Sequence, residues 1–133
     1  VDGKTMAAGN YATPMATFHS GRAAPLDLLF YTGDKFPAEY RGGAFVVLHG
    51  GGGAQTPQGH NGYNIMFMPF DRGGKAGEAR VFADGFAGPD PSNKNSGGKA
   101  KYRPVGAAVG PDGALYVADS VKGRIWRIAY GEG

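Results

Sequence analysis

The sequence predicts an all-β protein, and three observations lead to that fold class. Apolar residues stand in short runs, several of which alternate with polar residues as half-buried strands do. The 133 residues include 25 glycines and 9 prolines, which separate these runs as turn residues would. No stretch repeats its apolar residues at the spacing of an amphipathic helix. Aromatic residues, 12% of the chain, lie inside the runs, which favours a folded β protein over disorder.

The first four strands are expected after an opening segment, residues 1–17, that is small, polar and aperiodic. Their predicted bounds are Leu26–Tyr31, Ala44–His49, Tyr63–Phe70 and Arg80–Phe86. Glycine-rich polar loops follow the second and the fourth strand, at residues 50–62 and 87–100. Loops of this length are uncommon in a compact domain unless they are functional or disordered.

The segment from Tyr102 to Tyr130 holds the clearest strand pattern. Its three strands are expected at Val105–Val109, Leu115–Ala118 and Arg124–Ile128. A Pro-Asp-Gly turn at residues 111–113 joins the first two, because proline presets φ and glycine permits the reversal. The last strand alternates strictly, which places Ile125 and Trp126 on opposite faces of the sheet.

Composition and charge narrow the classes of partner. Fourteen Lys and Arg against eleven Asp and Glu give a net charge of +3, so the chain is weakly basic. The local basic cluster is Lys94, Lys99, Lys101 and Arg103, and no nucleic-acid-binding motif accompanies it, so no nucleic-acid partner is expected. The absence of cysteine excludes disulfides and thiolate metal sites. No apolar run approaches the ~20 residues of a membrane span, and the N-terminus lacks a signal-peptide core.

The segment around the Pro-Asp-Gly turn resembles the last blade of the soluble sugar and L-sorbosone dehydrogenases that use pyrroloquinoline quinone (PQQ). In those proteins an arginine, often preceded two positions earlier by a second basic residue, comes before a valine, an apolar run, the turn and a Leu-Tyr-Val strand. The matching residues in this chain are Lys101, Arg103, Val105, Pro111, Asp112, Gly113, Leu115, Tyr116, Val117 and Asp119. The closing GRIWRIAY, residues 123–130, adds to the specificity of the match.

A second block, from Phe18 to Phe70, carries the same resemblance independently. Its landmarks are FHS at 18–20, APL at 24–26, FYTG at 30–33, FPAEYRGGAF at 36–45 and LHG at 48–50. The chain departs from the family at residues 51–54, which read GGGA in place of serine, tryptophan, asparagine and arginine. It departs again at Asp27, where the family has glycine.

The resemblance implies the C-terminal part of a six-bladed β-propeller, with residues 18–75 as the penultimate blade and 76–133 as the last. It implies a quinoprotein oxidoreductase that oxidises a sugar, aldose or sorbosone-like substrate with PQQ and Ca²⁺. The electrons would pass to an external acceptor such as a cytochrome c, in a periplasmic or secreted location. Two blades cannot close a ring, so the upstream blades are expected partners and this chain alone is expected to be inactive.

Three residues are candidates for contact with the cofactor: Arg103, Lys101 and His49. PQQ carries three carboxylates, and a guanidinium offers the planar pair of N–H groups that such a ligand needs. Residues two apart share a face of a strand, so Lys101 and Arg103 could point into one cleft. The alternative is an ion pair with Asp119 or Asp112, and for His49 a hydrogen-bonded histidine at a strand end. The resemblance places the catalytic base and the Ca²⁺ ligands outside this chain.

The second hypothesis is a non-catalytic propeller module that binds a glycan or a protein, with three copies forming one ring. The aromatic residues that could stack on sugars are Tyr63, Phe67, Tyr102 and Trp126. At alternating positions such residues are more often core. The HGGG run at residues 49–52 is typical of esterase oxyanion loops, but the nucleophile elbow and helices of that fold are absent from the sequence. The three histidines are too scattered to predict a zinc site.

Overall fold

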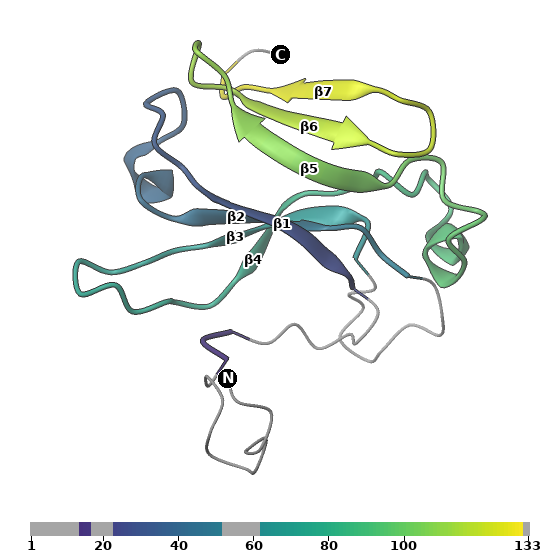
Figure 1. Cartoon of the computed structure of the whole chain (residues 1–133), viewed down its shortest axis with the longest axis horizontal. Helices are drawn as coiled ribbons and strands as arrows, with labels where there is room; N and C mark the ends of the chain where they lie inside the picture. Colours follow the sequence, from purple (N-terminus) through teal and green to yellow (C-terminus); the bar gives the residue numbers. More distant parts are fainter. Residues whose placement is uncertain (1–13, 17–22, 52–61, 132–133) are drawn as a thin grey trace, which may run out of the picture.

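The computed structural model describes residues 14–16, 23–51 and 62–131, which form two antiparallel β-sheets (Figure 1). The first sheet has the strand order β1-β2-β3-β4, and its strands are β1 (Pro25–Phe30), β2 (Ala44–Leu48), β3 (Asn64–Met68) and β4 (Arg80–Ala83). The second has the order β5-β6-β7, with strands β5 (Pro104–Val109), β6 (Leu115–Asp119) and β7 (Ile125–Ile128). Two short 3₁₀ helices, η1 (Ala38–Tyr40) and η2 (Pro91–Asn95), lie in the loops. The all-β prediction is confirmed.

All seven predicted strands are present, and their ends differ from the expected bounds by no more than about three residues. The largest difference is at β4, which ends at Ala83 because the chain turns away at Gly85, where φ is +90°. β4 pairs with β3 through Phe67 and Arg80. The two sheets therefore divide after Ala83, whereas the expected blade boundary at residues 75 and 76 falls inside the β3–β4 hairpin.

The two sheets begin in the same way. β1 opens with Pro25, which pairs with Leu48 at the end of β2, and the register shifts directly after the proline. β5 opens with Pro104, which pairs with Asp119 at the end of β6, and the register shifts at the same place. The two sheets thus share a start, a proline followed by a register shift, although their sequences differ.

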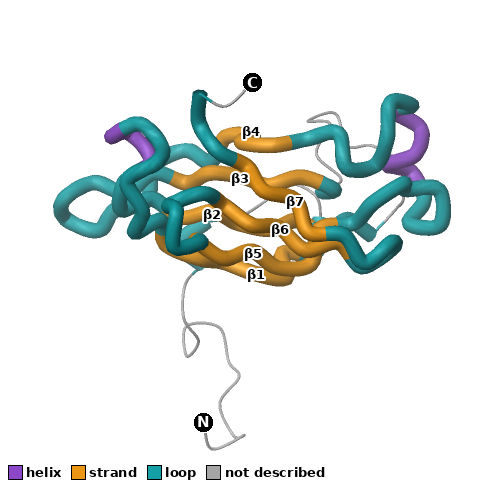
Figure 2. The backbone as a smooth tube through the Cα atoms, turned by 90° about the horizontal axis from the view of Figure 1, so that it is seen from above, coloured by secondary structure: helices purple, strands orange, loops and turns teal. Residues whose placement is uncertain are grey.

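The sheets are stacked face to face, with β5 beside β1 (Figure 2). Every residue of β2 and β3 is buried. Phe45 lies inside the largest core cluster, with the ring centroids of Phe67 and Phe82 at 5.3 and 4.6 Å. Leu115 and Val117 bring β6 into the same cluster. The core therefore lies between the two sheets and fixes their relative position.

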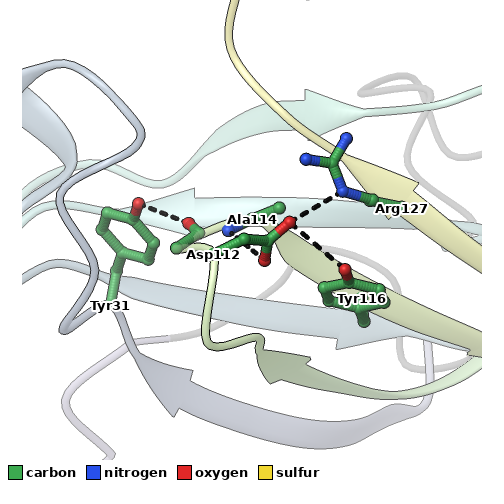
Figure 3. A network of polar contacts seen from close by, with 6 residues as sticks. Tyr31, Asp112, Ala114, Tyr116 and Arg127 are labelled. Atoms are coloured by element: carbon green, nitrogen blue, oxygen red, sulfur yellow. Dashed lines mark hydrogen bonds and ion pairs between the residues drawn. The ribbon is translucent and has the colours of Figure 1, made fainter.

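Polar side chains of the first sheet bond directly to the backbone of the second, among them Tyr31 and Asp27. Tyr31 donates its hydroxyl to the carbonyl of Gly113 at 2.7 Å, next to the Asp112 carboxylate that accepts from Arg127 (Figure 3). Asp27 accepts a hydrogen bond from the amide of Ala107 at 2.8 Å. Asp27 thus joins β1 to β5.

Candidate functional site

The candidate site lies where the end of β2 meets the start of β5. His49 follows β2, and its Nδ1 lies 2.8 Å from the carbonyl oxygen of Pro104. Because a carbonyl only accepts, Nδ1 donates this bond, and in the neutral form of the ring Nε2 is left as the acceptor. Arg103 donates from Nη2 to the carbonyl of Gly50. The structure therefore brings His49 and Arg103 together, although their contacts join residues more than fifty positions apart.

The backbone after β2 depends on glycine. Gly50 has φ +78°, and a Cβ at this position would lie 2.5 Å from the ring of Tyr63. Gly62 has φ +80°, and a Cβ there would lie 2.7 Å from the Gly50 backbone. The amides of His49 and Gly50 bond to the carbonyls of Ala24 and Ala23, which fixes this segment against the start of β1. Side chains at Gly50 and Gly62 would clash with Tyr63 and with the backbone of residues 49–50.

Arg103 is half-buried, and its guanidinium carbon lies 5.7 Å from the centre of the Tyr63 ring. Its Nε is buried and has no hydrogen-bond acceptor. Among the described residues no carboxylate pairs with this guanidinium, whereas Arg80, Lys94 and Arg127 all have acidic partners. Outside the described residues the chain carries two acidic residues, Asp2 and Glu132. Within residues 23–51 and 62–131, therefore, no N–H group of this guanidinium donates to a carboxylate.

Asp119 supports the main chain of Arg103 rather than its side chain. Its carboxylate accepts from the amides of Arg103, Lys122 and Val121 at 2.7, 2.8 and 3.1 Å. Burial raises the pKa of Asp119, but these backbone hydrogen bonds outweigh burial and hold the pKa below its ordinary value. Asp112, the other carboxylate considered as a partner for the predicted cations, pairs with Arg127.

Lys101 lies in a different environment from Arg103. β5 begins at Pro104, so the two basic residues precede the strand and do not share a strand face. Lys101 is exposed, its amide bonds to the carbonyl of Ala87, and its Nζ lies 5.5 Å from the centre of the Tyr102 ring. The structure therefore places Lys101 beside Tyr102, and not at the Arg103 guanidinium.

The residues considered for sugar stacking are mostly core. Tyr63 and Phe67 are fully buried, and Tyr102 is 7% exposed. Trp126 is half-buried and lines an open cleft of about 300 Å³ with Phe86 and others. The contact of Tyr63 with Arg103 could not be foreseen from the sequence, because the two residues lie forty positions apart.

Several sequence landmarks lie outside the described residues. These are the FHS segment at 18–20, His60, and residues 52–54 of the departing GGGA loop. In the described ranges, no three His, Cys, Asp or Glu side chains are grouped so that they could hold a metal ion. A search of the same ranges finds no helix that is long and apolar enough to span a membrane.

Comparison with known proteins gives a family for nearly the whole chain. The model of the TrAA12-like family matches residues 3–131. A protein of Borreliella burgdorferi, described as uncharacterized, is 31% identical over 109 residues. Those residues are 80% of this chain and 26% of that protein, so the chain spans a minor part of this relative. No solved structure matches the chain at a significant level.

Proposed function

The chain belongs to the TrAA12-like family, and we propose that it is part of a quinoprotein oxidoreductase that oxidises a sugar, aldose or sorbosone-like substrate with PQQ. The observation that carries the proposal is the Arg103 guanidinium, half-buried beside His49 and without a carboxylate partner among the described residues. A ligand carboxylate at the terminal nitrogens of the guanidinium would supply the anionic partner that Arg103 lacks among the described residues.

The described side chains fit one acidic edge of PQQ. Arg103 would hold a carboxylate, while the bond from Nη2 to Gly50 and the ring of Tyr63 keep the guanidinium in place. His49 would present Nε2, since Nδ1 is already bonded to Pro104. Lys101 would add positive charge at the exposed edge. When bound, PQQ supplies the two-electron acceptor for substrate oxidation.

Parts of the proposal rest on the resemblance rather than on residues of this chain. The proposal places the catalytic base and the ligands of a Ca²⁺ ion on other blades. Ca²⁺ would act there as a Lewis acid beside the cofactor. The external acceptor, such as a cytochrome c, and a periplasmic or secreted location are proposed on the same ground.

We propose further that the two sheets are two neighbouring blades of a β-propeller. The face-to-face stacking and the shared strand start support this arrangement. The outer strand face of the first sheet also carries large exposed apolar side chains: Leu26, Leu28 and Phe30 are 54%, 49% and 51% exposed. An upstream blade would cover them, which would remove an apolar patch that a soluble protein rarely leaves open. The remaining blades are therefore the first partners of this chain.

The test is PQQ affinity in the native protein, measured by calorimetric titration in the presence of Ca²⁺. Arg103→Ala should weaken binding about 10- to 100-fold, the range expected for a charge-assisted hydrogen bond. Arg72→Ala is the matched control, because Arg72 is exposed in the β3–β4 hairpin. It should leave the affinity unchanged. Wild-type affinity in the Arg103 variant would remove the assignment.

A further inference from the structure

A cluster of cations surrounds Tyr102, next to the proposed cofactor site, with which it shares Lys101. The Nζ atoms of Lys101 and Lys122 lie 5.5 and 5.8 Å from the centre of the Tyr102 ring, and the guanidinium carbon of Arg124 lies at 5.2 Å. Arg124 also donates from Nη1 to the Tyr102 hydroxyl at 2.9 Å. We call these three cations and the tyrosine the Tyr102 cluster. It joins the segment before β5 to the β6–β7 turn.

The cations of the Tyr102 cluster lack acidic partners within the described ranges. By contrast, Lys94 pairs with Asp84 at 2.7 Å and Arg127 with Asp112 at 2.8 Å. The carboxylate closest in sequence to the cluster is Asp119, and it accepts from backbone amides, including that of Lys122. The positive charge of the three side chains is therefore not balanced by an ion pair.

Three like charges around one ring repel one another. Each cation lies within 5.8 Å of the ring centre, less than the Debye length of about 8 Å at physiological ionic strength, so salt screens the charge around the ring only in part. Cation–π attraction to a single ring offsets part of the repulsion. An external carboxylate placed among the three side chains would turn the net electrostatic interaction from repulsive to attractive, because each cation would then face an opposite charge.

The shape of the cluster favours a protein partner over a small anion. All three cations are exposed, and none of them lines the cleft that Tyr102 borders. A small carboxylate would therefore meet exposed charges and no enclosing wall, and such contacts contribute little singly. A protein segment with several Asp or Glu residues would engage the three charges at once and gain from their sum.

We propose that the Tyr102 cluster is the docking surface for an acidic segment of a partner protein. The proposal does not depend on PQQ, because none of the four cluster residues except Lys101 belongs to the proposed cofactor site. Docking would be fast and salt-sensitive, since complementary charge mainly raises the association rate.

The experiment measures binding of a fluorescein-labelled peptide of ten glutamates to the native protein by fluorescence anisotropy at several salt concentrations. The variant Lys122→Gln/Arg124→Gln removes two charges and leaves Lys101 in place. The control variant Arg72→Gln/Lys75→Gln removes two exposed charges from the β3–β4 hairpin. We expect about a tenfold loss of affinity in the first variant and a flatter salt dependence, with little change in the control.

Equal losses in the two double variants would overturn the proposal, because the peptide would then respond to net charge alone. A ten-nucleotide oligothymidylate is measured in the same way. If it binds more tightly than the glutamate peptide, and the Lys122→Gln/Arg124→Gln variant loses that binding, the assignment to an acidic protein is overturned. The thermal midpoint of each variant is recorded alongside, and Tyr102→Phe gives a second readout. That variant frees Arg124 without removing a charge and should weaken peptide binding by a smaller factor than the double variant.

Discussion

Removing the hydroxyl of Tyr31 should weaken one of the polar contacts that join the two sheets. Tyr31 is 1% exposed, and its hydroxyl donates to the carbonyl of Gly113 at 2.7 Å while it accepts from the amide of Phe36 at 3.0 Å. Tyr31→Phe keeps the ring and its packing against Phe45. The substitution therefore tests the hydrogen bonds and not the core.

The expected cost follows from the two backbone groups that lose their partner. Gly113 and Phe36 are both buried, so water does not replace the hydroxyl. A buried polar group left without a hydrogen bond costs about 1–3 kcal/mol, and two of them give about 2–4 kcal/mol once relaxation is allowed for. That is a large part of the stability of a typical domain.

The assay is urea denaturation of the native protein, followed by the fluorescence of Trp126, the one tryptophan of these 133 residues. The matched control is Tyr116→Phe, because the Tyr116 hydroxyl makes a longer, exposed bond of 3.3 Å to Asp112. The control should change the free energy of unfolding by less than about 0.5 kcal/mol. Equal, small effects of the two substitutions would refute the reasoning that Tyr31 joins the sheets.

Two further predictions concern the support of the candidate site. Gly50→Ala places a side chain at φ +78° and 2.5 Å from the Tyr63 ring, so it should lower the thermal midpoint and weaken PQQ binding. The control Gly74→Ala has the same φ of +78° but open space around it, so it should lower the thermal midpoint alone. Retained PQQ affinity in the Gly50 variant would contradict the described geometry. Because the pKa of Asp119 is lowered, the folded protein binds a proton at this carboxylate less readily than the unfolded chain does. The contribution of Asp119 to the free energy of unfolding is therefore present above about pH 4 and is lost as the pH falls through the folded-state pKa. Asp119→Asn should therefore be less stable than wild type at pH 7 and differ less from it at pH 3, and equal differences in thermal midpoint at both pH values would contradict this.

The strands could be predicted from the sequence because their signals are local. Alternating apolar residues and the turn at residues 111–113 need no knowledge of distant parts of the chain. The grouping of β4 was harder to foresee. It depends on the Asp71 carboxylate, which accepts from the amides of Gly73 and Lys75 and folds the hairpin back onto β3. Composition alone does not show which sheet a short strand will join.

The site could be predicted only in part because its contacts are long-range. His49 and Arg103 were chosen separately, one as a strand end and one by resemblance, and the structure adds that they meet through Pro104 and Gly50. The expectation that Lys101 shares a strand face with Arg103 failed, since β5 starts after both residues. Their roles in binding the cofactor stay a prediction.

The most direct test of the central claim is an experimental structure of the native protein with bound PQQ. The account predicts a PQQ carboxylate oxygen about 2.7–2.9 Å from Nε or a terminal nitrogen of Arg103, the range for charge-assisted hydrogen bonds. PQQ bound away from the junction of β2 and β5, with the Nε of Arg103 still without an acceptor, would contradict the claim.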